Sequence, residues 1–260
     1  MILSDLHNHT LLCNHANGTV DEYVQMAISR GISIFGFSDH APMNFDTKYR
    51  MTFEQMQEYE NMVKDVATKY RDKIDVRMGY EVDYISGLVD ESVMNRDVDY
   101  FIGSVHFIDK WGFDNPEFIG KYDEMDIDKL WEKYFDSISE MAQTKQFDIV
   151  GHFDLIKVFK YFPKADITTL ASNALDAIAD SNMVIELNAA GLRKPVKEAY
   201  PSFTLLKEIQ RRGISISFGS DAHEISQVGQ FSEQLINFAK EAGFKSHMSF
   251  SKRKKEMLKF

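Results

Sequence analysis

The stretch Asp5-Leu6-His7-Asn8-His9 follows the apolar pair Ile2-Leu3 and begins a polar turn. In an extended segment the side chains at i and i+2 point to the same side, so His7 and His9 can face one point from the end of a strand. Two such imidazoles can begin a metal site. A single pair of this kind arises easily by chance among eight histidines, so the prediction depends on the remaining ones.

The same order, a short apolar run followed by polar residues, recurs along the chain. Runs of this length that are rich in β-branched and aromatic residues are typical of buried strands. We predict seven strands, over residues 2–6, 32–37, 74–84, 98–105, 148–153, 183–187 and 214–218.

Amphipathic segments separate these predicted strands. The first has both ends marked, because Thr19-Val20-Asp21-Glu22 is a capping box and Gly31 is a C-terminal stop signal. Comparable helices are predicted roughly over 52–70, 126–145, 168–181, 203–212 and 226–242. Alternating strands and helices joined by right-handed crossovers form a parallel sheet, which is either open or closed into a barrel.

A polar side chain stands at the carboxyl end of every predicted strand. In chain order these are His7 with His9, His40, Glu81, His106, His152, Asn188, and Asp221 with His223. An open sheet gathers its site from a few strands, whereas a closed barrel brings all its strand ends to one rim. The sequence therefore predicts an α/β fold, a distorted TIM-like barrel of seven βα units, in a single domain over residues 1–260.

Composition narrows the class of protein. The chain has 260 residues, 44% of them hydrophobic, and a net charge of −10, which argues against a large nucleic-acid interface. No apolar run reaches the ~20 residues of a membrane helix, so we expect a cytoplasmic protein without a membrane partner. The only cysteine, Cys13, is expected to be a small buried residue. The basic cluster Lys252-Arg253-Lys254-Lys255 is expected to be a solvated tail.

Seven of the eight histidines fall at or just after strand ends, and only His247 lies elsewhere. One such histidine is more often a hydrogen-bonded loop residue, but seven at equivalent positions indicate a shared role. The predicted metal ligands are His7, His9, His15, His40, Glu81, His106, His152, Asp221 and His223. Imidazoles and carboxylates without thiolates favour Zn, Mn or Fe(II). The set suffices for two or three ions, with Glu81 a natural bridge.

Six motifs carry a family resemblance: His7-Asn8-His9, Ser38-Asp39-His40, Gly79-Tyr80-Glu81, Ser104-Val105-His106, Gly151-His152 and Ser220-Asp221-Ala222-His223. As a set, over residues 5 to about 225, they resemble the polymerase and histidinol phosphatase (PHP) family. The segment from Asn188 to Pro195 is similar to the histidinol-phosphatase branch. The resemblance implies a (β/α)7 barrel with a trinuclear site. It assigns the first ion to His7, His9, Glu81 and Asp221, the second to Glu81, His106 and His152, and the third to His15, His40 and His223.

The reaction follows from the charge of such a site. Several divalent ions leave a positive field that favours an anionic small molecule such as a phosphate monoester. The resemblance implies hydrolysis of L-histidinol phosphate to L-histidinol and phosphate, by attack of a metal-bound hydroxide. We expect Asp221 and His223 to be catalytic as well, although the sequence does not choose between them and a bound water as the acid for the leaving group.

Substrate contacts are predicted from position. Arg193 and Lys157 both follow strand ends, where a cation at the rim would contact phosphate. The segment 107–116 lacks a helical period and is predicted to be a lid. Its Asp109, Trp111 and Asp114 would suit the ammonium and imidazole groups of histidinol phosphate.

Three other functions compete with this interpretation. A PHP phosphoesterase acting on a nucleotide, an oligonucleotide end or phosphotyrosine would use the same ligands. A metal-containing structural or binding module would have no turnover, but the complete ligand set argues against it. Hydrolysis of a C–N bond on a similar barrel would ordinarily require a lysine ligand at a strand end, and none stands among the predicted ligands.

Overall fold

The computed structural model describes residues 4–260. Residues 2 and 3 of the first predicted strand lie outside this range, and Ser4–Asp5 form β1. Within the described range one parallel sheet has the strand order β1-β2-β3-β4-β7-β8-β9, so each strand lies beside the next one along the chain. The other strands of the sheet are β2 (Ile34–His40), β3 (Asp75–Asp83), β4 (Tyr100–Ser104), β7 (Ile149–Val150), β8 (Val184–Asn188) and β9 (Ile216–Gly219).

The two edges of this sheet meet and close it into a barrel. The amide of Leu6 donates to the carbonyl of Phe218 at 2.9 Å, and the amide of Asp221 donates to the carbonyl of His7 at 2.7 Å. A further parallel bridge joins Asn8 to Ala222. Because β1 and β9 are joined in this way, all strand ends share one rim, and the predicted distorted (β/α)7 barrel is confirmed.

A tyrosine fills the barrel below the rim. The hydroxyl of Tyr100 donates to the carbonyl of Leu6 at 2.6 Å. A Cβ at position 36 would lie 2.0 Å from that hydroxyl oxygen, so β2 needs glycine at Gly36 for the ring to fit. The interior is therefore a packed core, and the site can form only above it, at the rim.

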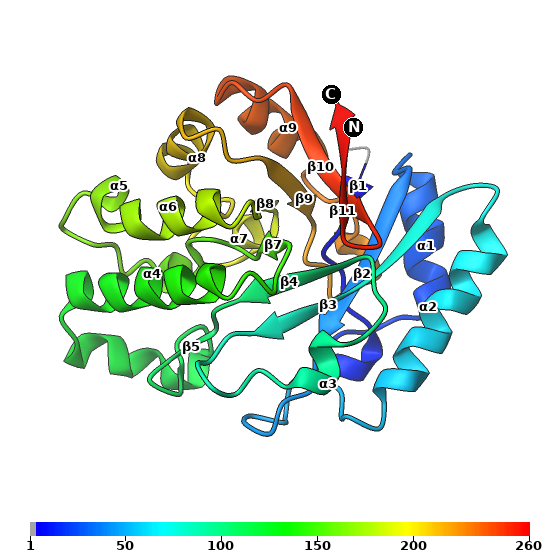
Figure 1. Cartoon of the computed structure of the whole chain (residues 1–260), viewed down its shortest axis with the longest axis horizontal. Coiled ribbons are helices and arrows are strands. Elements are labelled where there is room, and N and C mark those ends of the chain that lie inside the picture. Colours follow the sequence, from blue (N-terminus) through cyan, green and yellow to red (C-terminus); the bar gives the residue numbers. More distant parts are fainter. Residues whose placement is uncertain (1–3) are drawn as a thin grey trace.

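Helices cover the barrel on its outer side (Figure 1). The first carries the predicted capping box, in which Thr19 and Glu22 bond each other's backbone amides, and it ends before Gly31. Across residues 4–260 no helix is long and apolar enough to cross a membrane. The α-helices are α1 (Val20–Ser29), α2 (Met56–Tyr70), α3 (Glu91–Met94), α4 (Ile127–Gln143), α5 (Ile167–Leu170), α6 (Ser172–Asp180), α7 (Ala190–Arg193), α8 (Phe203–Arg211) and α9 (Ser232–Glu241).

Two predicted helices differ from those observed. The segment 168–181 is divided at Ala171 into α5 and α6. The helix expected from residue 226 begins only at Ser232, after the short 3-10 turn η4 (Ile225–Gln227). Gly229 and Phe231 have φ values of +62° and +63°, which no continuous helix accommodates. Hydrogen bonds to side chains outside this segment cause the break, since the amide of Gly229 donates to Asp5 and Ser220.

The segment 107–124 holds a small hairpin rather than an irregular loop. Strand β5 (Phe107–Ile108) pairs with β6 (Trp111–Gly112), and the 3-10 helix η2 (Pro116–Glu124) follows. Two other 3-10 turns, η1 (Leu11–Cys13) and η3 (Leu155–Phe159), come after β1 and β7. These irregular segments all follow strand ends, so they surround the rim.

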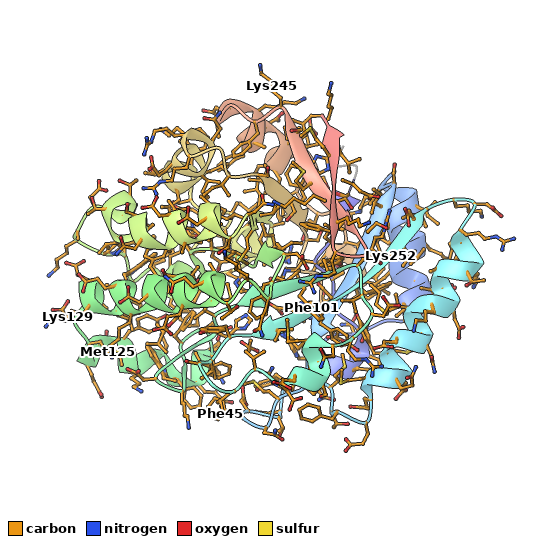
Figure 2. All side chains as sticks on the ribbon, viewed as in Figure 1. Phe45, Phe101, Met125, Lys129, Lys245 and Lys252 are labelled. Carbon is orange, nitrogen blue, oxygen red and sulfur yellow. The ribbon has the colours of Figure 1, made fainter. Side chains whose placement is uncertain are left out.

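The basic cluster is exposed at Lys252, Arg253 and Lys254, as expected, but it does not lie in a tail. Strands β10 (Ser246–Ser251) and β11 (Lys254–Lys259) form an antiparallel hairpin, and Lys252 projects from its turn (Figure 2). The guanidinium of Arg253 pairs with Asp148 and lies 4.7 Å from the centre of the Phe101 ring. Phe250 packs with Tyr100 in the core. A basic run can therefore belong to a folded hairpin when distant carboxylates accept its charges.

Candidate metal centre

Glu81, near the end of β3, lies at the middle of the rim. Its carboxylate is 2.8 Å from Nδ1 of His40, 3.0 Å from Nε2 of His152 and 3.5 Å from Nε2 of His7. These histidines come from three other strands or the turns after them. Because the strands are parallel and closed into a barrel, residues up to 145 positions apart converge on one carboxylate.

The candidate ligands fall into three groups. In each group one ligand atom per residue lies within 4.8 Å of the others, and the groups are His7, His9 and Glu81, then Glu81, His106 and His152, then His15, His40 and His223. Asp221 joins the first group, because its carboxylate is 3.2 Å from Nε2 of His9. The first two groups share Glu81 and are here called the inner groups. The third is called the outer group. This grouping agrees with the one implied by the family resemblance.

Cys13 lies beside the outer group. Its side chain is fully buried, as expected, and its sulfur lies within 4.8 Å of ligand atoms of His9 and His223. Burial raises the pKa of the thiol, and the nearby carboxylate of Asp39 raises it further. The neutral thiol is a poor metal ligand, so Cys13 remains a packing residue in our interpretation.

The chemistry of the donor atoms fits divalent cations. Nε2 of His7, His9 and His223 is buried and has no hydrogen-bond partner among the described residues. A buried polar atom without a partner is costly, so native proteins rarely keep several in one place unless a ligand satisfies them. Imidazole nitrogens around carboxylates suit Zn and similar transition metals. The described residues therefore form groups that can hold metal ions.

Buried carboxylates stand behind three histidines of the inner groups. Nδ1 of His7 is 2.8 Å from Glu186, Nδ1 of His9 is 3.3 Å from Asp39, and Nδ1 of His106 is 2.6 Å from Asp83. A carboxylate only accepts, so each Nδ1 carries the proton and each Nε2 presents a lone pair to the centre of the rim. Sequence reasoning missed these three residues as supports. Asp39 was visible within a motif, directly before His40, and Glu186 two residues before Asn188.

Backbone carbonyls orient two of the three histidines of the outer group, while Nδ1 of His40 faces Glu81. Nδ1 of His15 donates to the carbonyl of Cys13 at 2.8 Å, and Nδ1 of His223 donates to the carbonyl of Asp221 at 3.2 Å. His15 is exposed, whereas His7 and His9 are fully buried. The outer group is therefore neutral and open to solvent.

The pKa values of the histidines differ between the inner groups and the outer group. Burial opposes the charged form of His9, but Asp221 and Asp39 outweigh it and raise its pKa to about 9. Burial likewise opposes charge on His106, and Asp83 and Glu81 raise its pKa to about 10. In the outer group burial prevails and lowers the pKa of His40 to about 4. The inner groups thus lie in a negative field that attracts cations.

A cavity of about 810 Å³ opens above the candidate ligands. Its wall includes ligands from the inner and outer groups together with aromatic, acidic and basic side chains, among them His15, Tyr49, His106, Asp114, Arg193 and Tyr200. A cavity of this size can accept a small molecule.

Arg193 lines this cavity, as predicted. Its Nη2 donates to the carbonyls of Ser220 at 2.6 Å and Asp221 at 3.0 Å, while its Nη1 is buried without a partner among the described residues. The first two bonds fix the guanidinium, and Nη1 remains available to an anion. Asp114 also lines the cavity, and burial raises the pKa of its carboxyl against the attraction of His106.

The structure does not place Lys157 or Trp111 at the cavity. Nζ of Lys157 is buried and contacts Asp154 at 2.9 Å, the Ala199 carbonyl at 2.9 Å and Glu198 at 3.1 Å, so its three donors are used. The chain turns Lys157 inward because η3 packs it against these acceptors. Trp111 belongs to β6, and its ring packs 4.8 Å from that of Tyr122 in the core.

Asp109, the third residue predicted in the lid, lies on the surface. Its carboxylate pairs with Lys133 of α4, and both side chains are largely exposed. The tight turn between β5 and β6 directs it away from the rim. Of the three side chains predicted to contact substrate from the lid, Asp114 therefore lies in the cavity wall, and Asp109 and Trp111 do not.

Together, the parallel barrel and the histidine-rich rim define a class of proteins, the metal-binding TIM-like barrels. The PHP domain model matches residues 5–190, and the chain belongs to this family. It is 41% identical to the "Probable histidinol-phosphatase" of Deinococcus radiodurans, over 87% of this chain and 88% of that protein. It is 30% identical to the histidinol-phosphatase of Bacillus subtilis, over 89% of this chain and 97% of that protein.

A solved structure has the same fold. Histidinol phosphate phosphatase from Lactococcus lactis superposes with a TM-score of 0.81 at 20% identity, over 98% of this chain and 100% of that one. That protein is complexed with zinc, L-histidinol and phosphate. The comparison confirms the barrel over almost the whole length of this chain.

Proposed function

We propose that this chain is a metal-dependent phosphomonoesterase that hydrolyses L-histidinol phosphate to L-histidinol and phosphate. Residues 1–260 would form a single domain of the PHP type. The relatives named histidinol-phosphatase support this substrate, as do the ligands of the Lactococcus lactis protein. The observation that carries the proposal is the convergence of nine candidate metal ligands at one rim, seven of which line the cavity together with Arg193.

Two or three divalent ions, Zn, Mn or Fe, would be held by the groups described above. His7, His9, Glu81 and Asp221 would hold the first, Glu81, His106 and His152 the second, and the outer group the third. Bound ions of this kind activate water for attack on phosphorus and neutralise charge on phosphate oxygens. The role of the buried carboxylates behind the inner groups is to orient the histidines, which would keep the Nε2 atoms aimed at the ions.

Residues of this chain would then hold the two ends of the substrate. Nη1 of Arg193 would donate to a phosphate oxygen, since a guanidinium fixed by two carbonyls makes such a bond at little entropic cost. At the other end, Asp114 would accept from the ammonium group. The aromatic side chains of Phe45 and Phe107, which lie 5.2 Å apart and line the cavity, suit the imidazole ring.

Asp221 and His223 are proposed to act in catalysis in addition to ligation. Asp221 has a φ of +51° and its amide donates to the carbonyl of His7, which holds its carboxylate at the rim. We expect Asp221→Asn to lose more turnover than its loss of bound metal explains. The measurement is kcat at saturating metal, set against metal content. Equal losses in both quantities would show that Asp221 only ligates.

The partner would be a small-molecule phosphate monoester rather than nucleic acid, in accordance with the net charge of −10. Cys13 is a free buried thiol, which is compatible with the proposed cytoplasmic location. The alternative within the family is hydrolysis of a nucleotide, an oligonucleotide end or phosphotyrosine, and a substrate panel separates these from histidinol phosphate.

The decisive experiment is turnover of histidinol phosphate by protein whose metals have been quantified. We expect kcat/KM for this ester to exceed that for p-nitrophenyl phosphate and for nucleotides by about a hundredfold or more, because the contact of Asp114 with the ammonium and the aromatic contact with the imidazole ring are specific to it. Chelation should abolish phosphate release. Equal rates on all esters would overturn the substrate while leaving the reaction class.

A further inference from the structure

Tyr200 occupies a position in the cavity wall that the proposed metal and substrate contacts do not use. Its side chain is fully buried, and the residue lines the same cavity as His152, Asp114 and Arg193. Its phenolic oxygen has no hydrogen-bond partner among residues 4–260. A buried hydroxyl that has lost its water without gaining an acceptor is unfavourable by roughly 1–3 kcal/mol, so a ligand that supplies the acceptor would recover this energy.

The backbone holds Tyr200 firmly at the end of β8. The amide of Asn188 donates to the carbonyl of Tyr200 at 2.6 Å, and the amide of Tyr200 donates back at 3.1 Å. A Cβ at position 191 would lie 2.0 Å from the carbonyl of Glu198 and 3.0 Å from the tyrosine ring, so this close approach requires Gly191. The ring position is therefore set by the fold.

The side chain of Lys157 packs against this ring. Its Nζ lies 5.4 Å from the ring centre, and Asp154 and the carbonyl of Ala199 fix it there. The ring of His152 contacts the tyrosine edge-on, with ring centres 6.4 Å apart. A cation beside an aromatic face is attracted by it and restricts its motion. Tyr200 is thus held between a buried cation and a candidate metal ligand.

The tyrosine hydroxyl is an uncharged donor at working pH. A tyrosine phenol ordinarily titrates at about pH 10, so it keeps its proton under these conditions. A neutral phenol donates a hydrogen bond without adding charge. The group that would accept most strongly in this cavity is a phosphate oxygen, because charged acceptors make the stronger bonds.

We propose that the hydroxyl of Tyr200 donates a hydrogen bond to a phosphoryl oxygen of the bound ester, opposite or beside the contact from Nη1 of Arg193. Both residues lie on the segment that follows β8, and each has a buried donor without a partner in the described chain. The inference rests on the proposed function, because it assumes that a phosphate occupies this cavity. It adds a binding residue that lacks charge and that the metal groups do not include.

The test is Tyr200→Phe, which removes one oxygen and keeps the ring. Calorimetric titration of the metal-loaded protein with inorganic phosphate measures the contact directly. We expect phosphate affinity to fall roughly tenfold to a hundredfold, as for loss of a hydrogen bond to a charged group. Metal content should stay unchanged and the unfolding temperature should not fall, because the hydroxyl bonds no described residue and its burial is unfavourable.

Tyr23→Phe is the matched control. The hydroxyl of Tyr23 is also buried and unpartnered within residues 4–260, but Tyr23 does not line the cavity, so its phosphate affinity should equal that of the unsubstituted protein. Phosphate affinity of Tyr200→Phe within twofold of the unsubstituted protein would overturn the inference. So would a large fall in metal content or failure to fold, since either would make the hydroxyl structural.

This design keeps the inference separate from the proposed substrate. If histidinol phosphate is not turned over but Tyr200→Phe still binds phosphate more weakly, the substrate is wrong and the contact stands. If the ester is turned over and phosphate binding is unaffected by Tyr200→Phe, the contact is wrong and the function stands.

Discussion

The inner groups and the outer group of the rim use the same imidazole ligands but differ in what surrounds them. Glu81 and Asp221 contribute negative charge to the inner groups, and buried carboxylates stand behind His7, His9 and His106. The outer group consists of three neutral histidines, and backbone carbonyls support His15 and His223.

This difference implies that the groups of one rim can bind metal ions with different affinities. Affinity for a cation rises with the negative charge of its ligands and with the support behind them. The outer group has no carboxylate among its own ligands, a carboxylate contacts Nδ1 of His40 at 2.8 Å but no carboxylate supports His15, and His15 is exposed. We therefore expect an ion of the outer group to exchange more readily than ions of the inner groups, and the following variants test that order.

The largest effect is expected from Glu81→Gln. This change removes the carboxylate shared by the two inner groups while keeping its volume. Metal content should fall to that of the outer group or less. We expect kcat/KM to fall by more than about a hundredfold, because loss of a residue that only orients a metal ligand already lowers metal affinity or activity about 10- to 100-fold. Elemental analysis after dialysis and steady-state kinetics measure both.

Glu60→Gln is the control for this variant. Glu60 is a buried glutamate that pairs with Arg96 on the flank of the barrel, away from the rim. Its loss should lower stability and leave metal content unchanged. If Glu81→Gln retained all its ions, Glu81 would not be a shared ligand.

A smaller effect is expected from Asp83→Asn. Asp83 accepts from His106 and also pairs with Arg50 at 2.9 Å, and His106 and then Arg50 lower its pKa despite burial. An amide cannot fix the histidine tautomer in the same way, so the affinity of the second ion should fall about 10- to 100-fold. Competition with a chelating dye measures this constant.

Asp99→Asn serves as the matched control for Asp83→Asn. Asp99 lies at the amino end of β4, at the opposite end of the barrel, and accepts from the amide of Met78. Its substitution should leave metal affinity alone. An unchanged affinity in Asp83→Asn would mean that support by a buried carboxylate does not distinguish the inner groups.

His15→Ala tests the outer group itself. Removal of one exposed neutral ligand should lower metal content by about one ion per chain, with activity reduced about tenfold and recovered in excess metal. The readout is metal content after dialysis at several free-metal concentrations. Loss of all ions together would break the comparison, because it would show that the groups fill as one unit.

The smallest effect concerns His247, the described histidine that lies outside the rim. It packs between Phe218 and Phe260, with both ring nitrogens unpartnered among the described residues, and burial lowers its pKa to about 4. The unfolded chain therefore binds a proton that the folded chain rejects between pH 6.5 and 4. Stability from this group is intact above pH 6.5 and falls by about 3 kcal/mol as pH drops below 4.

His247→Phe should remove this loss. Urea unfolding of metal-free protein at pH 7 and pH 5 measures it, and the variant should lose less stability on acidification than the unsubstituted protein does. Equal losses in both proteins would show that His247 does not contribute to the acid sensitivity.

Much of the rim was predictable, because strands and their ends follow from local periodicity. His40 stands three positions after the apolar run 32–37 and His152 lies near the end of the run 148–153, and parallel strands then bring such residues together. The role of Lys157 was not predictable in this way. Whether a lysine after a strand reaches the rim or turns inward depends on acceptors such as Ala199, 42 residues away.

The C-terminal hairpin shows the same limit. A basic run at the end of a chain predicts a solvated tail, but Arg253 pairs with Asp148, 105 residues earlier. Likewise the helix predicted from residue 226 begins only at Ser232, because Asp5, near the other end of the chain, accepts from the amide of Gly229.

By itself, the sequence determined the alternation of strands and helices, the barrel class and the set of side chains at the strand ends, since each depends on spacing along the chain. Only the tertiary structure decided which carboxylate stands behind which histidine, which donors remain without partners in the cavity, and that Tyr200 belongs to its wall. Those features depend on distances between residues far apart in the chain, and closure of the barrel brings them within bonding range.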